Sequence, residues 1–222
     1  MFRDAKSFNQ PLDSWDTSNV KFMQSMFNGA KNFNQPLDSW NVESVEEMQN
    51  MFGGAHNFNQ RLDSWDVSSV RNMQHMFKYA KNFNQPLDKW DTSNVRSMAF
   101  MFENAESFNQ CLDNWNVESV DNMQKMFRDA TSFNQPLNNW KTSNVSIMAS
   151  LFEGAKNFNQ PLDNWDVTNC SSKNIRNIIR RENMFRGAES MLRTFPNLKE
   201  TPDTFSWKEN FNRAKPTKGA QH

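Results

Sequence analysis

The stretch FNQPLDSW occupies residues 8–15 and returns unchanged at residues 33–40. Near copies follow at a constant interval of 25 residues, and all seven copies keep Phe-Asn-Gln at the front and Trp at the back. They begin at Phe8, Phe33, Phe58, Phe83, Phe108, Phe133 and Phe158. Repetition at a fixed period is typical of proteins in which each unit packs only against its neighbours. The sequence therefore predicts a stack of seven units.

The composition supplies enough apolar residues for such a stack. The chain has 222 residues, a formal net charge of zero and only 36% hydrophobic residues, but it includes 20 Phe, 14 Met and 8 Trp. These aromatic and sulfur-containing side chains argue against a disordered chain. No apolar run approaches the ~18 residues of a membrane span, and no basic-then-apolar signal segment opens the sequence. The sequence therefore leaves the localisation open.

Each unit divides into two halves with different patterns. In the first unit Val20, Met23, Met26, Phe27 and Ala30 follow the spacing of an apolar helix face. The other half, FNQPL, alternates between two sides and predicts a strand of three to five residues. We therefore expect an α/β solenoid of about seven strand–helix units with a parallel sheet. A mainly-β right-handed solenoid is the alternative.

The unchanging amides of FNQ admit two interpretations. They could bind a ligand, or they could form a structural ladder in which identical amides of stacked units bond to one another. We favour the ladder, with the Gln column on the same side as Phe and Leu, because a buried amide must be satisfied. The predicted ladder residues are Asn9, Gln10, Asn34, Gln35, Asn59, Gln60, Asn84 and Gln85.

Three other patterns could carry chemistry, and each has a structural explanation. Asp13 and Asp16 could bind calcium, but a turn explains them better. The Trp column could stack on sugars or bases, although regular packing accounts for its period. Basic residues of the segment 173–193 could contact an acidic partner or could be the charged face of a cap. No catalytic motif, metal-ligand set or phosphate loop occurs, so we expect neither an enzyme nor a cofactor.

The positions that vary between units predict where a partner binds. They carry most of the charge and are expected to face outward. The candidate partner-binding positions are Lys21, Glu46, Arg71, Arg96 and Asp121. The partner is expected to be a protein. Nucleic acid is disfavoured because residues 1–170 hold 14 Lys and Arg against 20 Asp and Glu, a net charge of −6.

The regular pattern predicts boundaries near the C-terminus. Residues 1–170 form the expected solenoid, and residues 171–192 are predicted to be a modified last repeat that acts as a cap. Residues 193–222 are expected to be an irregular tail. The chain starts inside a repeat at Met1-Phe2, which suggests an uncapped end. A self-assembling structural protein that stacks through this end is therefore the alternative to a binding scaffold.

The full pattern V-x-x-M-x-x-M-F-x-x-A-x-x-F-N-Q-x-L-x-x-W resembles a known family over roughly residues 1–170. It is similar to the BspA-type, leucine-rich-repeat-like surface proteins, in the 25-residue variant found in mycoplasma surface lipoproteins. The resemblance implies a leucine-rich-repeat-like solenoid at the cell surface that binds other proteins or host cells. It implies no enzyme activity. The chain differs from these surface proteins because it shows no signal or lipoprotein segment.

Overall fold

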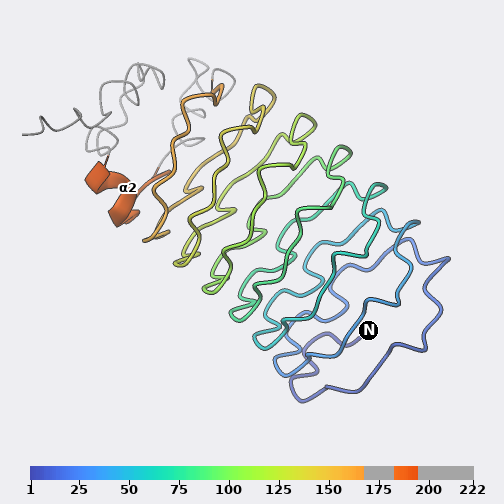
Figure 1. Cartoon of the computed structure of the whole chain (residues 1–222). Coiled ribbons are helices and arrows are strands. Elements are labelled where there is room, and N and C mark those ends of the chain that lie inside the picture. The colour runs from blue at the N-terminus through green and yellow to red at the C-terminus, as the bar shows by residue number, and fades with distance from the viewer. Residues whose placement is uncertain (168–182, 195–222) are drawn as a thin grey trace, which may run out of the picture.

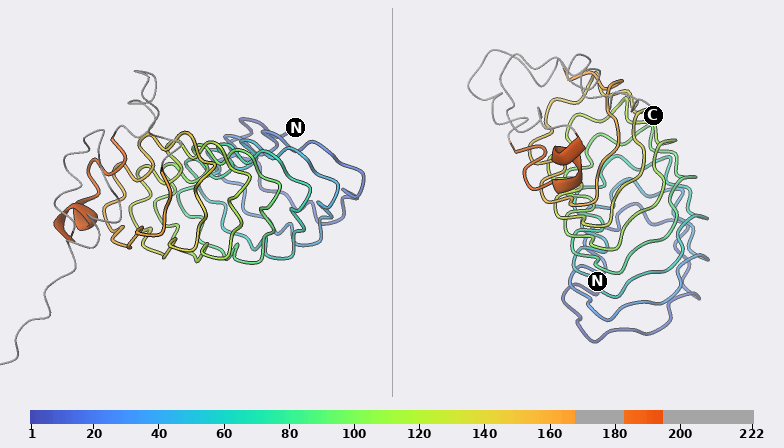
Figure 2. Two further views of the ribbon diagram at one scale, coloured as in Figure 1. Left: turned by 90° about the horizontal axis from the view of Figure 1, so that it is seen from above. Right: turned by 60° about the vertical axis from the view of Figure 1, so that its left-hand side comes forward.

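The chain winds into a stack of coils, with one coil for each 25-residue repeat. The computed structural model describes residues 1–167 and 183–194. Successive coils lie side by side along one axis, with the N-terminus at one end and the short helix α2, Glu189–Thr194, at the other (Figure 1; Figure 2). Neighbouring repeats of the sequence are therefore neighbours in space.

The predicted strand–helix solenoid with a parallel sheet is wrong, and so is the mainly-β alternative. Within the described ranges α2 is the one helix, and parallel pairing is limited to isolated bridges of single residues. These bridges follow one position from coil to coil: Phe22 with Glu47, Glu47 with Asn72, Asn72 with Ser97, Ser97 with Asn122, and Asn122 with Ile147. The coils are held together without a sheet.

Two left-handed residues interrupt each predicted helix. In the first repeat Ser25 has φ 58° and Gly29 has φ 71°. This left-handed backbone conformation costs about 1–2 kcal/mol for a residue other than Gly. The N–H groups of Ser25 and Phe27 donate to carbonyls of the next coil, at 2.9 Å in both cases. The alternate N–H groups close tight turns within the coil: Met26 donates to the Met23 carbonyl at 3.3 Å and Asn28 to the Ser25 carbonyl at 3.2 Å. The backbone donors thus bond across coils, where a helix would use them internally.

The predicted strand has no backbone ladder because side chains take its place. Five of the seven coils have Pro at the slot of Pro11, and Pro has no N–H to donate. Instead the N–H of Asn34 donates to the side-chain Oδ1 of Asn9 at 2.8 Å. The indole N–H of Trp40 donates to the Leu12 carbonyl of the preceding coil at 2.9 Å. This half of the coil is therefore stacked through side chains that bond to backbone.

The core consists of aromatic columns that run the length of the stack. Phe27 and Phe33 of one coil stack with ring centroids 4.0 Å apart, and Phe27 lies 5.6 Å from Phe52 of the next coil. All three rings are fully buried. Burying one such side chain contributes about 1.5–3 kcal/mol. Because much of each ring's cover comes from neighbouring coils, a single coil could not be stable alone.

One variable position that was expected to face outward is buried. The slot of Thr17 alternates between Thr and Val along the chain, and all of its described members are buried. The Thr17 hydroxyl donates to the Asn41 carbonyl at 2.8 Å, and the hydroxyls of Thr92 and Thr142 make the equivalent bond. Thr and Val have the same shape, so either side chain fills this slot.

The regular stack continues into the C-terminal repeat, although the Met-Phe pattern comes later in the sequence there than the period predicts. The N–H of Phe152 donates to the Met184 carbonyl at 2.9 Å, and the Phe185 ring stacks on Phe152 at 5.7 Å. Met184 and Phe185 therefore occupy the next coil, although they come eight residues later than the period predicts. The remaining predictions for residues 168–182 and 195–222 lie outside the described residues.

Candidate functional site

The five predicted partner-binding positions form one continuous row, which we call the outer ladder. The row has one member per coil, and from the second member on each N–H donates to the carbonyl of the preceding member at 2.8–2.9 Å. The members are Lys21, Glu46, Arg71, Arg96 and Asp121. All are exposed except Glu46, which is half-buried. The backbone bonds fix the register of the row, so the side chains project from adjacent coils at the same angle.

Part of the outer ladder lines a groove that crosses four neighbouring coils, which we call the outer groove. The groove encloses about 700 Å³. Its lining residues are all polar or charged: Lys21, Glu43, Ser44, Glu46, Ser68, Ser69, Arg71 and Asn94. Arg96 and Asp121 continue the ladder beyond the groove. The structure thus separates the five predicted positions into three that line a concavity and two that do not.

Charges of both signs meet in the outer groove. The Arg71 guanidinium lies 3.8 Å from the Glu46 carboxylate; the Arg71 side chain is exposed and that of Glu46 is partly exposed. An exposed pair of this kind contributes little to stability, about 0–1 kcal/mol. The groove therefore offers two carboxylates and two cations that can exchange solvent contacts for contacts with a partner.

Tight turns beside the groove hold its rim in place. The Asp66 carboxylate accepts a hydrogen bond from the N–H of Ser68 at 3.0 Å. Hydrogen bonds from the Ser68 hydroxyl and N–H keep the pKa of Asp66 below its usual value, so the Asp66 carboxylate is ionised at neutral pH. Ser18 bonds Asp16 in the same way. The Asx turn therefore begins at the Asp16 slot.

The amide residues Asn9, Gln10, Asn34, Gln35, Asn59, Gln60, Asn84 and Gln85 lie along the stack, but their bonds are not between like amides. The Oδ1 of Asn34 accepts from the N–H of Asn59 at 2.9 Å and from the Nε2 of Gln60 at 3.0 Å. The same arrangement repeats up to Asn134, which accepts from Asn159 and Gln160. From Asn34 on these side chains are half-buried, and the Gln column is not in the core.

Alternating charges form a second row that was not predicted from the sequence, which we call the ion-pair ladder. Glu103 is 3% exposed and pairs with Lys78 at 2.7 Å and with Arg128 at 3.2 Å. Arg128 also reaches Glu153 at 3.4 Å, and Arg186 lies 3.8 Å from Glu153. Lys78, Glu103, Arg128 and Glu153 occupy the same position of successive repeats, so the alternation of their charge was visible in the sequence.

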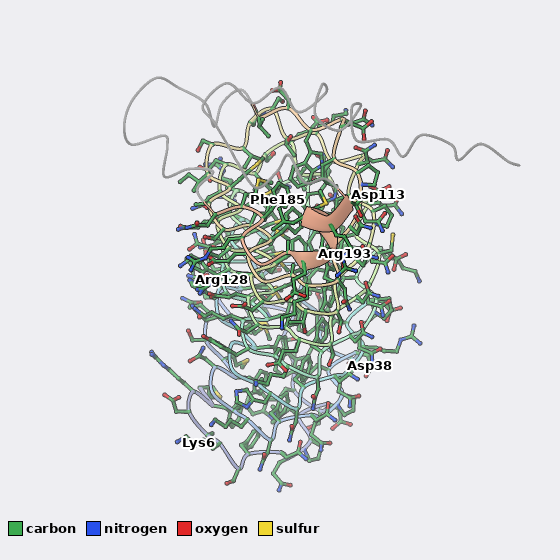
Figure 3. All side chains as sticks on the ribbon, turned by 90° about the vertical axis from the view of Figure 1, so that its left-hand side faces the viewer. Lys6, Asp38, Asp113, Arg128, Phe185 and Arg193 are labelled. Carbon is green, nitrogen blue, oxygen red and sulfur yellow. The ribbon has the colours of Figure 1, made fainter. Side chains whose placement is uncertain are left out.

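The two long edges of the stack carry different residues. Lys6 and Arg128 lie along one edge, whereas Asp38 and Asp113 lie along the opposite edge (Figure 3). Across residues 1–167 and 183–194, no three His, Cys, Asp or Glu side chains are grouped so that they could hold a metal ion. Helix α2, the described helix, is too short to cross a membrane.

Comparison with known proteins places the repeat in a family. A family model described as "Mycoplasma protein of unknown function, DUF285" matches residues 1–113 and again residues 81–198. The chain belongs to this family. No curated protein and no solved structure matches it significantly. The match to DUF285 thus identifies a mycoplasma-type repeat family, and it shows neither leucine-rich-repeat geometry nor adhesion.

Proposed function

We propose that this DUF285 chain is a non-enzymatic scaffold that binds a protein partner through the outer groove. The observation that carries the proposal is the division between slots. From the second coil on, the unchanging apolar slots are buried, whereas the varied charged slots of the outer ladder reach solvent and lie in one register. The resemblance to BspA-type proteins supports a partner outside the cell, with adhesion as the finer form of this function.

The chemistry of the outer groove suits recognition of a polar protein surface. Carboxylates at Glu43 and Glu46 and cations at Lys21 and Arg71 can meet opposite charges, while hydroxyls such as that of Ser69 accept or donate hydrogen bonds. Complementary charges select a partner and speed association more than they raise affinity. The rigid backbone beneath them lowers the entropic cost of binding.

The test compares two sets of substitutions in the outer ladder. We expect Lys21→Ser, Glu46→Ser and Arg71→Ser together to weaken binding of a captured partner at least tenfold, because these side chains line the groove. The matched control, Arg96→Ser with Asp121→Ser, changes the same row outside the groove and should leave affinity within about twofold. Equal affinity in both sets would refute the groove as the binding site.

A further inference from the structure

Two columns of left-handed residues run through the stack, and they hold unusual residues only at its centre. One column consists of Ser25, Asn50, His75, Phe100, Lys125, Ser150 and Asn183. The other consists of Asp4, Gly29, Gly54, Tyr79, Asn104, Asp129, Gly154 and Gly187. Most members are Gly or small polar residues that tolerate positive φ. Tyr79 and Phe100 are large aromatic residues, and the backbone strain of a positive φ at such residues is often associated with function.

The unusual residues of both columns meet in one cluster, which we call the central patch. It comprises His75, Lys78, Tyr79, Phe100 and Lys125. The His75 imidazole stacks on the Phe100 ring with centroids 4.4 Å apart and an angle of 10° between planes. The Lys78 ammonium lies 5.2 Å from the Phe100 centroid and 5.4 Å from that of Tyr79. Tyr79 is 41% exposed, and the other four members of the patch are half-buried.

The rings and ammonium groups of the central patch present an electropositive surface. Phe100 is flanked by His75 and Lys78 of the preceding coil and by Lys125 of the following coil, whose ammonium lies 5.5 Å from the ring centroid. With its faces covered, the ring offers its edges, which carry partial positive charge.

The two ammonium groups differ in their partners. Glu103 neutralises Lys78 at 2.7 Å, but Lys125 makes no ion pair with any residue that the structure describes. Burial, with the Lys78 charge as a smaller contribution, lowers the pKa of His75, so its imidazole is neutral at pH 7. Lys125 is thus the available cation of the central patch, beside the half-buried Phe100 ring.

We propose that the central patch is a second binding site, specific for an acidic protein segment. A carboxylate of the segment pairs with Lys125, and an adjoining apolar side chain packs on Tyr79. Tyr is one of the residue types enriched among those that dominate the energetics of protein interfaces. Bases and sugars stack on open ring faces, and the Phe100 faces are already covered. The proposal shares only the class of partner with the outer groove and uses different residues.

The neighbouring repeats supply the substitutions that test the central patch. Tyr79→Gly and Phe100→Ser place in these slots the residues found at Gly54 and Ser25, so the fold accommodates them. We expect the thermal midpoint of the double variant to stay unchanged or rise. Its affinity for a labelled peptide of alternating Glu and Leu should fall at least tenfold. Lys125→Ser should cause a similar loss, and Lys125→Arg should retain most of the affinity.

Three controls test whether binding is specific to the central patch and to an acidic peptide. A peptide of alternating Lys and Leu should not bind, and the triple variant in the outer groove should bind the Glu-Leu peptide normally. The proposal is overturned if the Glu-Leu peptide does not bind, or if Tyr79→Gly with Phe100→Ser leaves its affinity unchanged. It is also overturned if labelled oligothymidylate or heparin binds more tightly than the peptide and this binding depends on Lys125. None of these results bears on the outer groove, whose own variants test it independently.

Discussion

Asn84 shows how one residue joins three repeats. Its Oδ1 accepts from the N–H of Asn109 at 2.9 Å and from the Nε2 of Gln110 at 3.0 Å, while its own N–H donates to Asn59. The side chain thus acts as the acceptor that a strand carbonyl would supply in a sheet. An oxygen at this position is essential, whereas the amide nitrogen is not used in these bonds.

Substitutions at Asn84 distinguish this arrangement from a ladder of like amides. Asn84→Ala removes the acceptor and should lower the free energy of unfolding by about 1–3 kcal/mol. Asn84→Asp keeps the acceptor and should cost clearly less. Urea unfolding of both variants measures the difference. If Asp is as damaging as Ala, the amide nitrogen matters and the described bonding is incomplete.

His75 and His56 make the stability of the stack depend on pH. Burial lowers the pKa of His75 below 6.5, and Lys78 adds to this effect. Burial, then Lys31 and Lys81, lowers the pKa of His56 in the same way. The unfolded chain therefore binds protons first as the pH falls, so stability is full above about pH 6.5 and declines below it.

Unfolding experiments between pH 8 and pH 5 should reveal this decline. We expect His75→Asn with His56→Lys to flatten the profile, since Asn50 and Lys31 occupy the same slots in neighbouring repeats. A decline of the same size in the double variant would show that other groups cause it.

At the scale of the element, the repeated segment from Met23 to Ala30 explains why the helix prediction failed. Met23, Phe27 and Ala30 are all buried, as the sequence spacing predicts. Two successive tight turns satisfy that spacing as well as a helix does. The distinguishing signal was the recurrence of Gly, Asn, Asp or Ser at the slots of Ser25 and Gly29, and aromatic residues at Phe100 and Tyr79 obscured it.

Two glycines of the same slot test the left-handed conformation. Gly54 and Gly154 have φ 71° and 70°, but a Cβ at Gly154 would collide with the Asp129 carboxylate, whereas one at Gly54 would meet nothing closer than 3.5 Å. Gly54→Ala should therefore cost about 1–2 kcal/mol of folding stability, and Gly154→Ala more. The excess should vanish in an Asp129→Gly background. Equal costs in the wild-type background would contradict the described packing.

The sequence was also informative about the candidate site, though unevenly. The row from Lys21 to Asp121, which variation between repeats indicated, reaches solvent, and its role in binding stays a prediction. The same reasoning missed the buried ion pairs of Glu103, where charge is tolerated because an opposite charge stacks above and below it. Contacts between residues of successive coils cannot be predicted from the sequence until the register of the coils is known.

At the scale of the whole molecule, stacking predicts that the protein accepts the loss of a complete repeat. Deleting residues 76–100 joins His75 to Met101 and restores the Met-Phe pattern in register. We expect cooperative urea unfolding with a smaller m-value, because less surface is exposed. Deleting residues 76–99 instead leaves one extra residue and should abolish cooperative folding. If both deletions fold equally well, the period of 25 is not a structural requirement.

The central claim is that alternate backbone N–H groups of the segment predicted to be helical donate to the next coil, where a helix would use them internally. NMR couplings across hydrogen bonds, measured on the full chain, identify the acceptor of each N–H directly. For Phe102 we predict a coupling to the carbonyl carbon of Met126, 24 residues later, at a donor–acceptor distance of 2.9 Å. A coupling to the carbonyl of Met98, the acceptor in an α-helix, would contradict the account.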